Sequence, residues 1–153
     1  MTTTANAIRK TWVFQANPNL YSIETSLRLE SEEFWNLRQH AKAIKVGDRV
    51  LIWISGPEAG IYAVGTVITA PITMSDSEKG QEYWLDKTKG RQLAPRVRVR
   101  YDQKLIDRPL KKDYLEWDPD LANLSIICFP RGTNFPVTEA EWLAIKKWLD
   151  SAV

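Results

Sequence analysis

The sequence is poor in cysteine and histidine, with one residue of each among 153. Cys128 cannot form a disulfide within the chain, and one cysteine with one histidine leaves no zinc site of the usual ligand spacing. We therefore expect no metal, no cofactor and a cytoplasmic or similarly reducing compartment. Cys128 lies in the apolar segment LSIICF and is predicted to be a small buried side chain. His40 has no carboxylate or thiol at a catalytic spacing, which favours a structural or surface role.

Long apolar runs are also missing. No stretch approaches the about 20 residues that a membrane-spanning helix needs, and the N-terminus lacks the apolar core of a signal peptide. A hydrophobic content of 44% and a charged content of 26% are ordinary for a soluble globular protein. We expect residues 1–10, which are polar and rich in threonine, to form a disordered tail, and residues 11–153 to form one domain.

Tryptophan, in contrast, is abundant, with seven residues in a chain of this length. Several can be core residues, but so many bulky rings raise the chance that some line a pocket. The net charge is only +2, yet the segment from Lys87 to Lys112 holds ten basic and two acidic residues. This uneven distribution indicates either a surface that faces a polyanion or a solvated strand face.

The segment from Val46 to Thr69 predicts a β-hairpin around which the rest is organised. Residues 50–54 are β-branched and aromatic and read as a strand buried on both faces, residues 55–60 supply turn chemistry, and residues 61–69 form the second strand. Trp53 lies at the strand end next to the turn. A ring in that place is either core or a platform for a ligand.

Further elements follow from periodicity and capping signals. We expect strands at 11–16, 96–101 and 124–129, a helix from Ser22 to about Leu29, and a final helix over 139–150 behind the capping box of Thr138 and Glu141. In RVRVRY the valines and Tyr101 are predicted to face the core and the three arginines to face away. The pattern predicts an α+β fold: a small curled β-barrel of five or six strands with two or three helices around it.

Two regions lack a clear period. Residues 30–44 include Phe34 and Trp35 among polar side chains, and residues 70–92 are predicted to be a long loop that carries Tyr83 and Trp84. A bulky ring in polar company is a better candidate for binding than one in an apolar run. A loop of that length in a compact domain is usually functional or mobile.

The order of these segments resembles the EVE domain family, a PUA-like family related to YTH domains. The resemblance rests on TWVFQANPNLYSI at 11–23, FWNLRQ at 34–39, KVGDRVLIWISGPEAGIYAVGTV at 45–67 and GTNFPVTEAEW at 132–142. It implies a non-catalytic module that binds a modified base of DNA or RNA, flipped or single-stranded, in an aromatic cage. Trp35 is similar in position to the cage tryptophan of the family, and Trp84 lies where YTH domains carry further cage aromatics.

The remaining candidate residues follow from the same resemblance and from the charge pattern. Base-edge contacts are expected from Asn36 and, after the first strand, from Asn17 and Tyr21; Trp53 completes the base-binding set with Trp35 and Trp84. Flanking phosphates are expected to contact Arg38, Lys42, Lys87, Lys89 and Arg91. This chain has QANP at 15–18, where many EVE members have Lys-Ser-Glu-Pro.

Two other classes of function stay open at this point. Exposed tryptophans are also typical of protein-interaction modules. An enzyme that processes nucleotides or RNA is a third interpretation, but the sequence shows no nucleophile with a base, no spaced carboxylate pair and no phosphate-binding glycine loop.

Overall fold

The computed structural model describes residues 9–151, and nearly all of the predicted N-terminal tail lies outside them. The strands are β1 (Thr11–Ala16), β2 (Glu32–Asn36), β3 (Arg49–Ile54), β4 (Gly60–Val67), β5 (Ile72–Met74), β6 (Ala94–Lys104), β7 (Leu110–Lys111) and β8 (Asn134–Val137). The helices are α1 (Ile23–Leu29), α2 (Glu78–Tyr83), α3 (Lys87–Arg91), α4 (Lys112–Glu116), the 3₁₀ helix η2 (Pro119–Leu121), α5 (Ser125–Cys128) and α6 (Glu139–Ser151).

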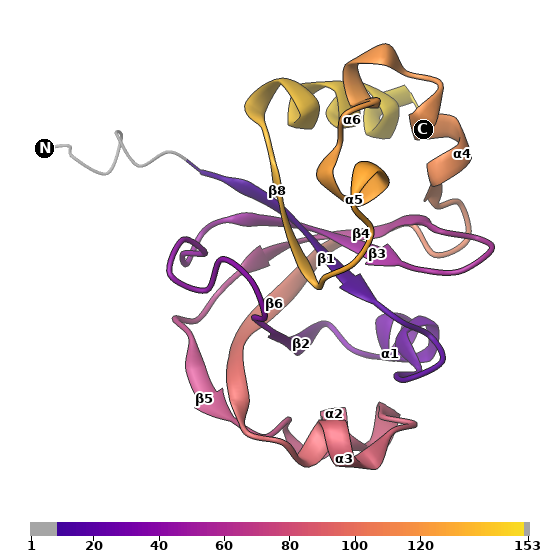
Figure 1. The fold of residues 1–153 in the computed structure, drawn as a ribbon. Coiled ribbons are helices and arrows are strands. Elements are labelled where there is room, and N and C mark those ends of the chain that lie inside the picture. Colours follow the sequence, from indigo (N-terminus) through magenta and orange to yellow (C-terminus); the bar gives the residue numbers. More distant parts are fainter. Residues whose placement is uncertain (1–8, 152–153) are drawn as a thin grey trace, which may run out of the picture.

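The strands form one curled sheet in the order β2-β6-β4-β3-β1-β8, with β5 paired to β6 and β7 paired to β4. β1 and β3 run parallel, and β3 and β4 form the predicted central hairpin. Figure 1 shows α4, α5 and α6 on one side of the sheet and α1, α2 and α3 on the other. The predicted class, a curled α+β barrel with helices around it, is confirmed, although the described residues contain more strands and helices than we expected.

The central strands are buried on both faces because each face covers a separate core. Along β1, Trp12 and Phe14 belong to the first core and Val13 to the second. Along β3, Ile52 belongs to the first core, and Trp53, only 2% exposed, belongs to the second. The second core is closed by α6, whose N-terminus is fixed by the predicted capping box: the Glu141 amide donates to Thr138 Oγ1 at 3.1 Å, and the Thr138 amide donates to Glu141 Oε1 at 2.9 Å.

Three sequence predictions about local structure are wrong. Residues 32–36, for which we found no period, form β2, because Glu33 and Trp35 alternate inward while their neighbours face outward. Residues 70–92 are not a loop but hold β5, α2 and α3. The predicted strand at 124–129 is mostly the short helix α5, and Cys128 is exposed on it.

Candidate nucleic-acid interface

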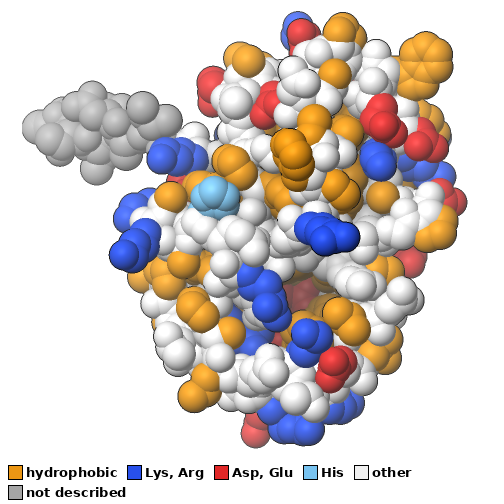
Figure 2. Space-filling model, viewed as in Figure 1, with side chains coloured by type: hydrophobic (Ala, Val, Ile, Leu, Met, Phe, Trp, Pro, Cys, Tyr) orange, Lys and Arg blue, Asp and Glu red, His pale blue; other side chains and the backbone are white. Residues whose placement is uncertain are grey.

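A cleft of about 470 Å³ opens between the barrel and the segment that carries α2 and α3. Figure 2 shows the hollow, with Lys and Arg side chains around it and an acidic side chain at its base. Its lining comes from five parts of the chain: Gln15, Ala16, Asn17, Leu20 and Tyr21; Glu33, Phe34, Trp35, Asn36 and Arg38; Ser55; Asp76, Trp84, Lys89 and Arg96; and Pro130, Gly132 and Thr133. A cavity of this size is in the range that holds a small organic group.

Aromatic rings form a large part of the cleft wall. Trp84 contacts Tyr21 edge to face, with 5.0 Å between ring centroids. The indole N–H of Trp84 donates to Asp76 Oδ2 at 2.7 Å, and that of Trp35 donates to the Tyr101 hydroxyl at 3.0 Å. Since both polar N–H groups are bonded within the protein, the two indoles are fixed in orientation and present carbon surface to the cleft.

A buried carboxylate, Glu33, supports this wall from beneath. It accepts hydrogen bonds from the Tyr21 hydroxyl at 2.5 Å, from Ser26 Oγ at 3.0 Å and from the Tyr101 hydroxyl. Burial raises the pKa of Glu33, although these three donors act in the opposite direction. Burial and the neighbouring Glu33 carboxylate also raise the pKa of Tyr21, so this ring is held in place as a neutral donor.

This raised pKa predicts a pH effect on stability. In the unfolded chain Glu33 ionises near pH 4, whereas in the fold it ionises at higher pH. The stability that depends on its protonated form is complete below the unfolded pKa and is lost as pH rises through the folded pKa. The parent protein should therefore lose this part of its stability as pH rises from 4 to 8, whereas Glu33→Gln should not. In urea titrations, the free energy of unfolding of the variant minus that of the parent should increase over this range.

Asp102→Asn is the matched control, since it should shift the other way. Burial raises the pKa of Asp102, but hydrogen bonds from Thr66 and Arg100 outweigh it, and the net direction is downward. The stability that ionised Asp102 contributes is present above the unfolded pKa and is lost on acidification. The free energy of unfolding of Asp102→Asn minus that of the parent should therefore decrease as pH rises. If the stability of both variants, relative to the parent, changed in the same direction with pH, the raised pKa of Glu33 would be contradicted.

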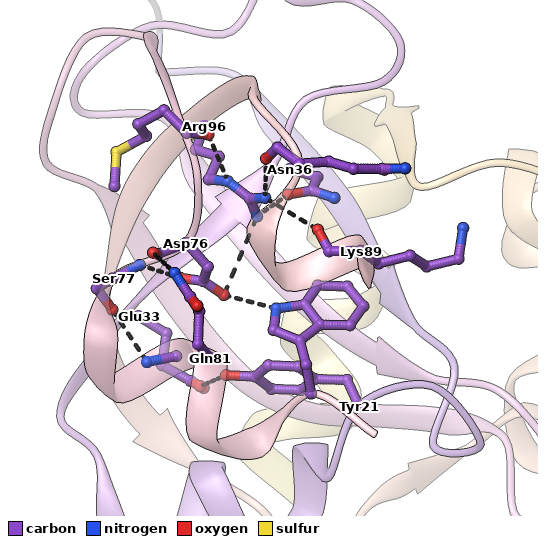
Figure 3. Close-up of polar contacts among 12 residues, drawn as sticks. Tyr21, Glu33, Asn36, Asp76, Ser77, Gln81, Lys89 and Arg96 are labelled. Atoms are coloured by element: carbon purple, nitrogen blue, oxygen red, sulfur yellow. Dashed lines mark hydrogen bonds and ion pairs between the residues drawn. The ribbon is translucent and has the colours of Figure 1, made fainter. Parts of the chain in front are cut away.

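The far side of the cleft depends on Arg96, which is 1% exposed. Its guanidinium donates to the backbone oxygens of Met74 at 3.0 Å and Gln92 at 3.1 Å, reaches that of Lys89 at 3.5 Å, and donates to the Asn36 side-chain oxygen. Its Nη1 lies 4.0 Å from Asp76 Oδ2 (Figure 3). Arg96 therefore joins β2, β5 and α3. It points away from the first core, as predicted, but unlike Arg98 and Arg100 it is buried and is not part of a solvated strand face.

Asp76 is the acidic partner in this network. Besides the bond from Trp84, its Oδ1 accepts from the Ser77 amide at 2.8 Å. Burial raises the pKa of Asp76, and burial lowers that of Arg96, so each ion depends on the other and on its hydrogen bonds. Two glycines permit the close approach: a Cβ at Gly80 would lie 2.2 Å from Asp76 Oδ1, and one at Gly90 would lie 2.7 Å from Trp84 Cδ1.

The structure brings most of the predicted base-binding residues together. Trp35, Asn36, Asn17, Tyr21 and Trp84 all line the cleft. Asn36 is engaged by Arg96, and the Asn17 side-chain oxygen accepts from the Asn19 amide at 2.9 Å.

Trp53 does not join the other predicted base-binding residues. It lies in the second core, because the regular alternation along β3 turns Trp53 to the same face as Leu51, beneath the C-terminal helices. It is therefore a core residue of this fold.

The predicted phosphate contacts divide into two groups. Arg38 and Lys89 line the cleft. Lys42, Lys87 and Arg91 do not, and the Lys87 ammonium instead donates to the backbone oxygens of Gln81 at 3.1 Å and Glu82 at 3.4 Å, at the end of α2. Any role of these three in binding would therefore be outside the cavity lining.

Sequence reasoning did not identify Glu33, Asp76 and Arg96 as parts of the site. The alternation of Glu33 with Trp35 was the available signal for Glu33. For Asp76 and Arg96 no local signal exists, because the pair forms only when α2 and α3 fold over β6.

Comparison with known proteins identifies the relatives of this chain. Residues 10–148 match the model of the EVE domain family. A search of curated proteins gave no match. No helix in the described range, 9–151, is long and apolar enough to cross a membrane.

Several solved structures share the fold at low sequence identity. A hypothetical protein from Leishmania major has 19% identity and a TM-score of 0.72, covering 95% of this chain and 97% of its own. The Agrobacterium tumefaciens protein Atu2648 has 19% identity and a TM-score of 0.67, covering 91% and 92%. The human THYN1 protein, solved in complex with DNA that contains 5-methylcytosine, has 15% identity and a TM-score of 0.65, covering 89% and 95%.

Proposed function

Because the chain belongs to the EVE domain family, we propose that it is a non-catalytic module that binds a modified base of a nucleic acid in the cleft. One observation carries the proposal: fixed indole and phenol rings wall a recessed cavity, and basic side chains lie at its lining. The human structural neighbour, bound to DNA containing 5-methylcytosine, supports a nucleic-acid partner and suggests the first probe.

The geometry fits a base that has left its stack. The cleft reaches to the buried side chains Tyr21, Glu33 and Trp35, which a base paired within a helix cannot contact. Stacking on aromatic faces contributes about 1–3 kcal/mol per base and distinguishes bases poorly. Selection would therefore come from polar groups at the wall, such as Asn17, and from the fixed size of the cavity, since one added methyl group is worth about 1–3 kcal/mol in a shaped pocket.

Arg38 and Lys89 supply the electrostatic part of the proposal. Cations at the mouth of the cleft would contact the phosphates that flank the bound base, which gives affinity without sequence preference. Binding should accordingly weaken as salt concentration rises.

The test is a binding screen with fluorescent oligonucleotides, as DNA and RNA, that carry 5-methylcytosine, 5-hydroxymethylcytosine, N6-methyladenine or no modification. We expect at least one modified oligonucleotide to bind more tightly than its unmodified form. Trp84→Leu removes one ring of the wall and should weaken that binding by about 1–3 kcal/mol, measured by anisotropy.

Trp117→Leu is the matched control, because Trp117 is 86% exposed and does not line the cleft. It should bind as the parent protein does, and both variants should be checked for a native thermal transition. Equal affinity of Trp84→Leu and the parent protein, with both folded, would rule out the cleft as the base site.

The exposure of Trp117 also favours a second candidate, a protein-interaction module. On that interpretation no modified oligonucleotide in the screen would bind more tightly than its unmodified form. Trp117→Leu, and not Trp84→Leu, would then abolish binding of a protein partner.

A further inference from the structure

The loop between α5 and β8 forms one lip of the cleft. Pro130, Gly132 and Thr133 line the cavity, whereas the preceding residue, Phe129, turns its ring to solvent and is 75% exposed. Arg131, in the same loop, is also exposed. The loop that forms this lip therefore carries an exposed aromatic side chain and an exposed cation, each next in sequence to a residue that lines the cleft.

This lip is held firmly by the barrel. Gln15 Nε2 donates to the backbone oxygens of Pro130 at 3.0 Å and Gly132 at 2.8 Å. The Gln15 amide donates to the Thr133 oxygen at 2.8 Å, and the Thr133 amide donates to Gln39 Oε1 at 2.8 Å. The backbone of the lip next to Phe129 is therefore fixed relative to the cleft, and the Phe129 ring extends from it into solvent.

We propose that Phe129 stacks on the base adjacent to the one held in the cleft, while Arg131 contacts the phosphate backbone beside it. The inference rests on the proposed function and adds a second binding element to it. A base that enters the cleft leaves its neighbour with an uncovered face, and an aromatic or apolar side chain at the opening covers that face. The neighbour's face is available both in a single strand and in a duplex from which one base has been flipped.

The experiment pairs a protein variant with a change in the ligand. Affinity is measured for the parent protein and for Phe129→Ala on the best modified oligonucleotide from the screen and on a version with abasic sites on both sides of the modified base. Both ligands are prepared single-stranded and as duplexes. Trp117→Ala is the matched control, an equally exposed aromatic residue that does not line the cleft.

We expect Phe129→Ala to weaken binding of the intact oligonucleotide about 5- to 140-fold, which corresponds to one stacked base. The abasic ligand should bind the parent protein equally weakly, and Phe129→Ala should then cause no further loss. A loss confined to duplexes would assign Phe129 to filling the gap of a flipped base, and a loss in single strands would assign it to an unpaired neighbour.

Two results would overturn the inference while leaving the proposed function intact. One is unchanged affinity of Phe129→Ala for the intact modified oligonucleotide. The other is the same loss on intact and abasic ligands, which would mean that Phe129 acts on the cleft itself. Absence of binding by the parent protein to every oligonucleotide would instead refute the proposed function, and the inference with it.

Discussion

Replacing Arg96 with methionine is expected to lower the free energy of unfolding by about 3–5 kcal/mol, because removal of one partner leaves a buried charge uncompensated. The arginine is fully enclosed and bonds to Met74, Gln92 and the side chain of Asn36. Methionine fills a similar volume but supplies no donor. The carboxylate of Asp76 would lose its buried cation, and the backbone oxygens of Met74 and Gln92 would lose the donors that Arg96 supplies.

The measurement is urea unfolding at neutral pH together with a thermal melt. For a chain of this length the loss corresponds to a fall in Tm of roughly 6–20 °C. Arg98→Met is the matched control on the same strand, since the Arg98 side chain is 44% exposed and its ion pair is with Glu32. Exposed pairs contribute about 0–1 kcal/mol, so this variant should melt almost as the parent does. Similar losses in the two variants would show that Arg96 does not hold the cleft wall.

The same strand shows how far the sequence alone could lead. The alternation in RVRVRY correctly predicts β6 and the inward faces of Val97, Val99 and Tyr101. It cannot distinguish Arg96 from Arg98, because both point away from the first core. What separates them is that residues 70–92 fold over one end of the strand, an arrangement between distant segments that no local period encodes.

The candidate site divides in a similar way. The resemblance to a family correctly indicated five residues that line the cleft. It could do so because members of one fold place corresponding positions of the chain at corresponding places in space. Glu33 was missed because its alternation with Trp35 was not recognised as a strand period, and Asp76 because an isolated acidic residue in polar sequence carries no sign of burial. Trp53 was assigned to the base site because its ring lies at a strand end, whereas the alternation along β3 places it with Leu51 on the face of the second core.

Trp35 is both a core residue and a wall of the cleft, so its replacement should affect stability and binding together. The side chain is 7% exposed, packs in the first core with Phe14 and donates to Tyr101. Truncation of a buried tryptophan costs about 3–5 kcal/mol. We expect Trp35→Ala to show that loss in urea unfolding and, at a temperature where it is folded, to bind the modified oligonucleotide about 1–3 kcal/mol more weakly.

Trp12→Ala separates the two effects. Trp12 lies in the same core, is 4% exposed and donates to Asp48 Oδ2 at 2.9 Å, but it does not line the cleft. Both variants should be destabilised to a similar extent, whereas only Trp35→Ala should lose affinity. If Trp12→Ala loses as much affinity as Trp35→Ala, the loss reflects a loosened core, and the ring of Trp35 does not contact the bound base.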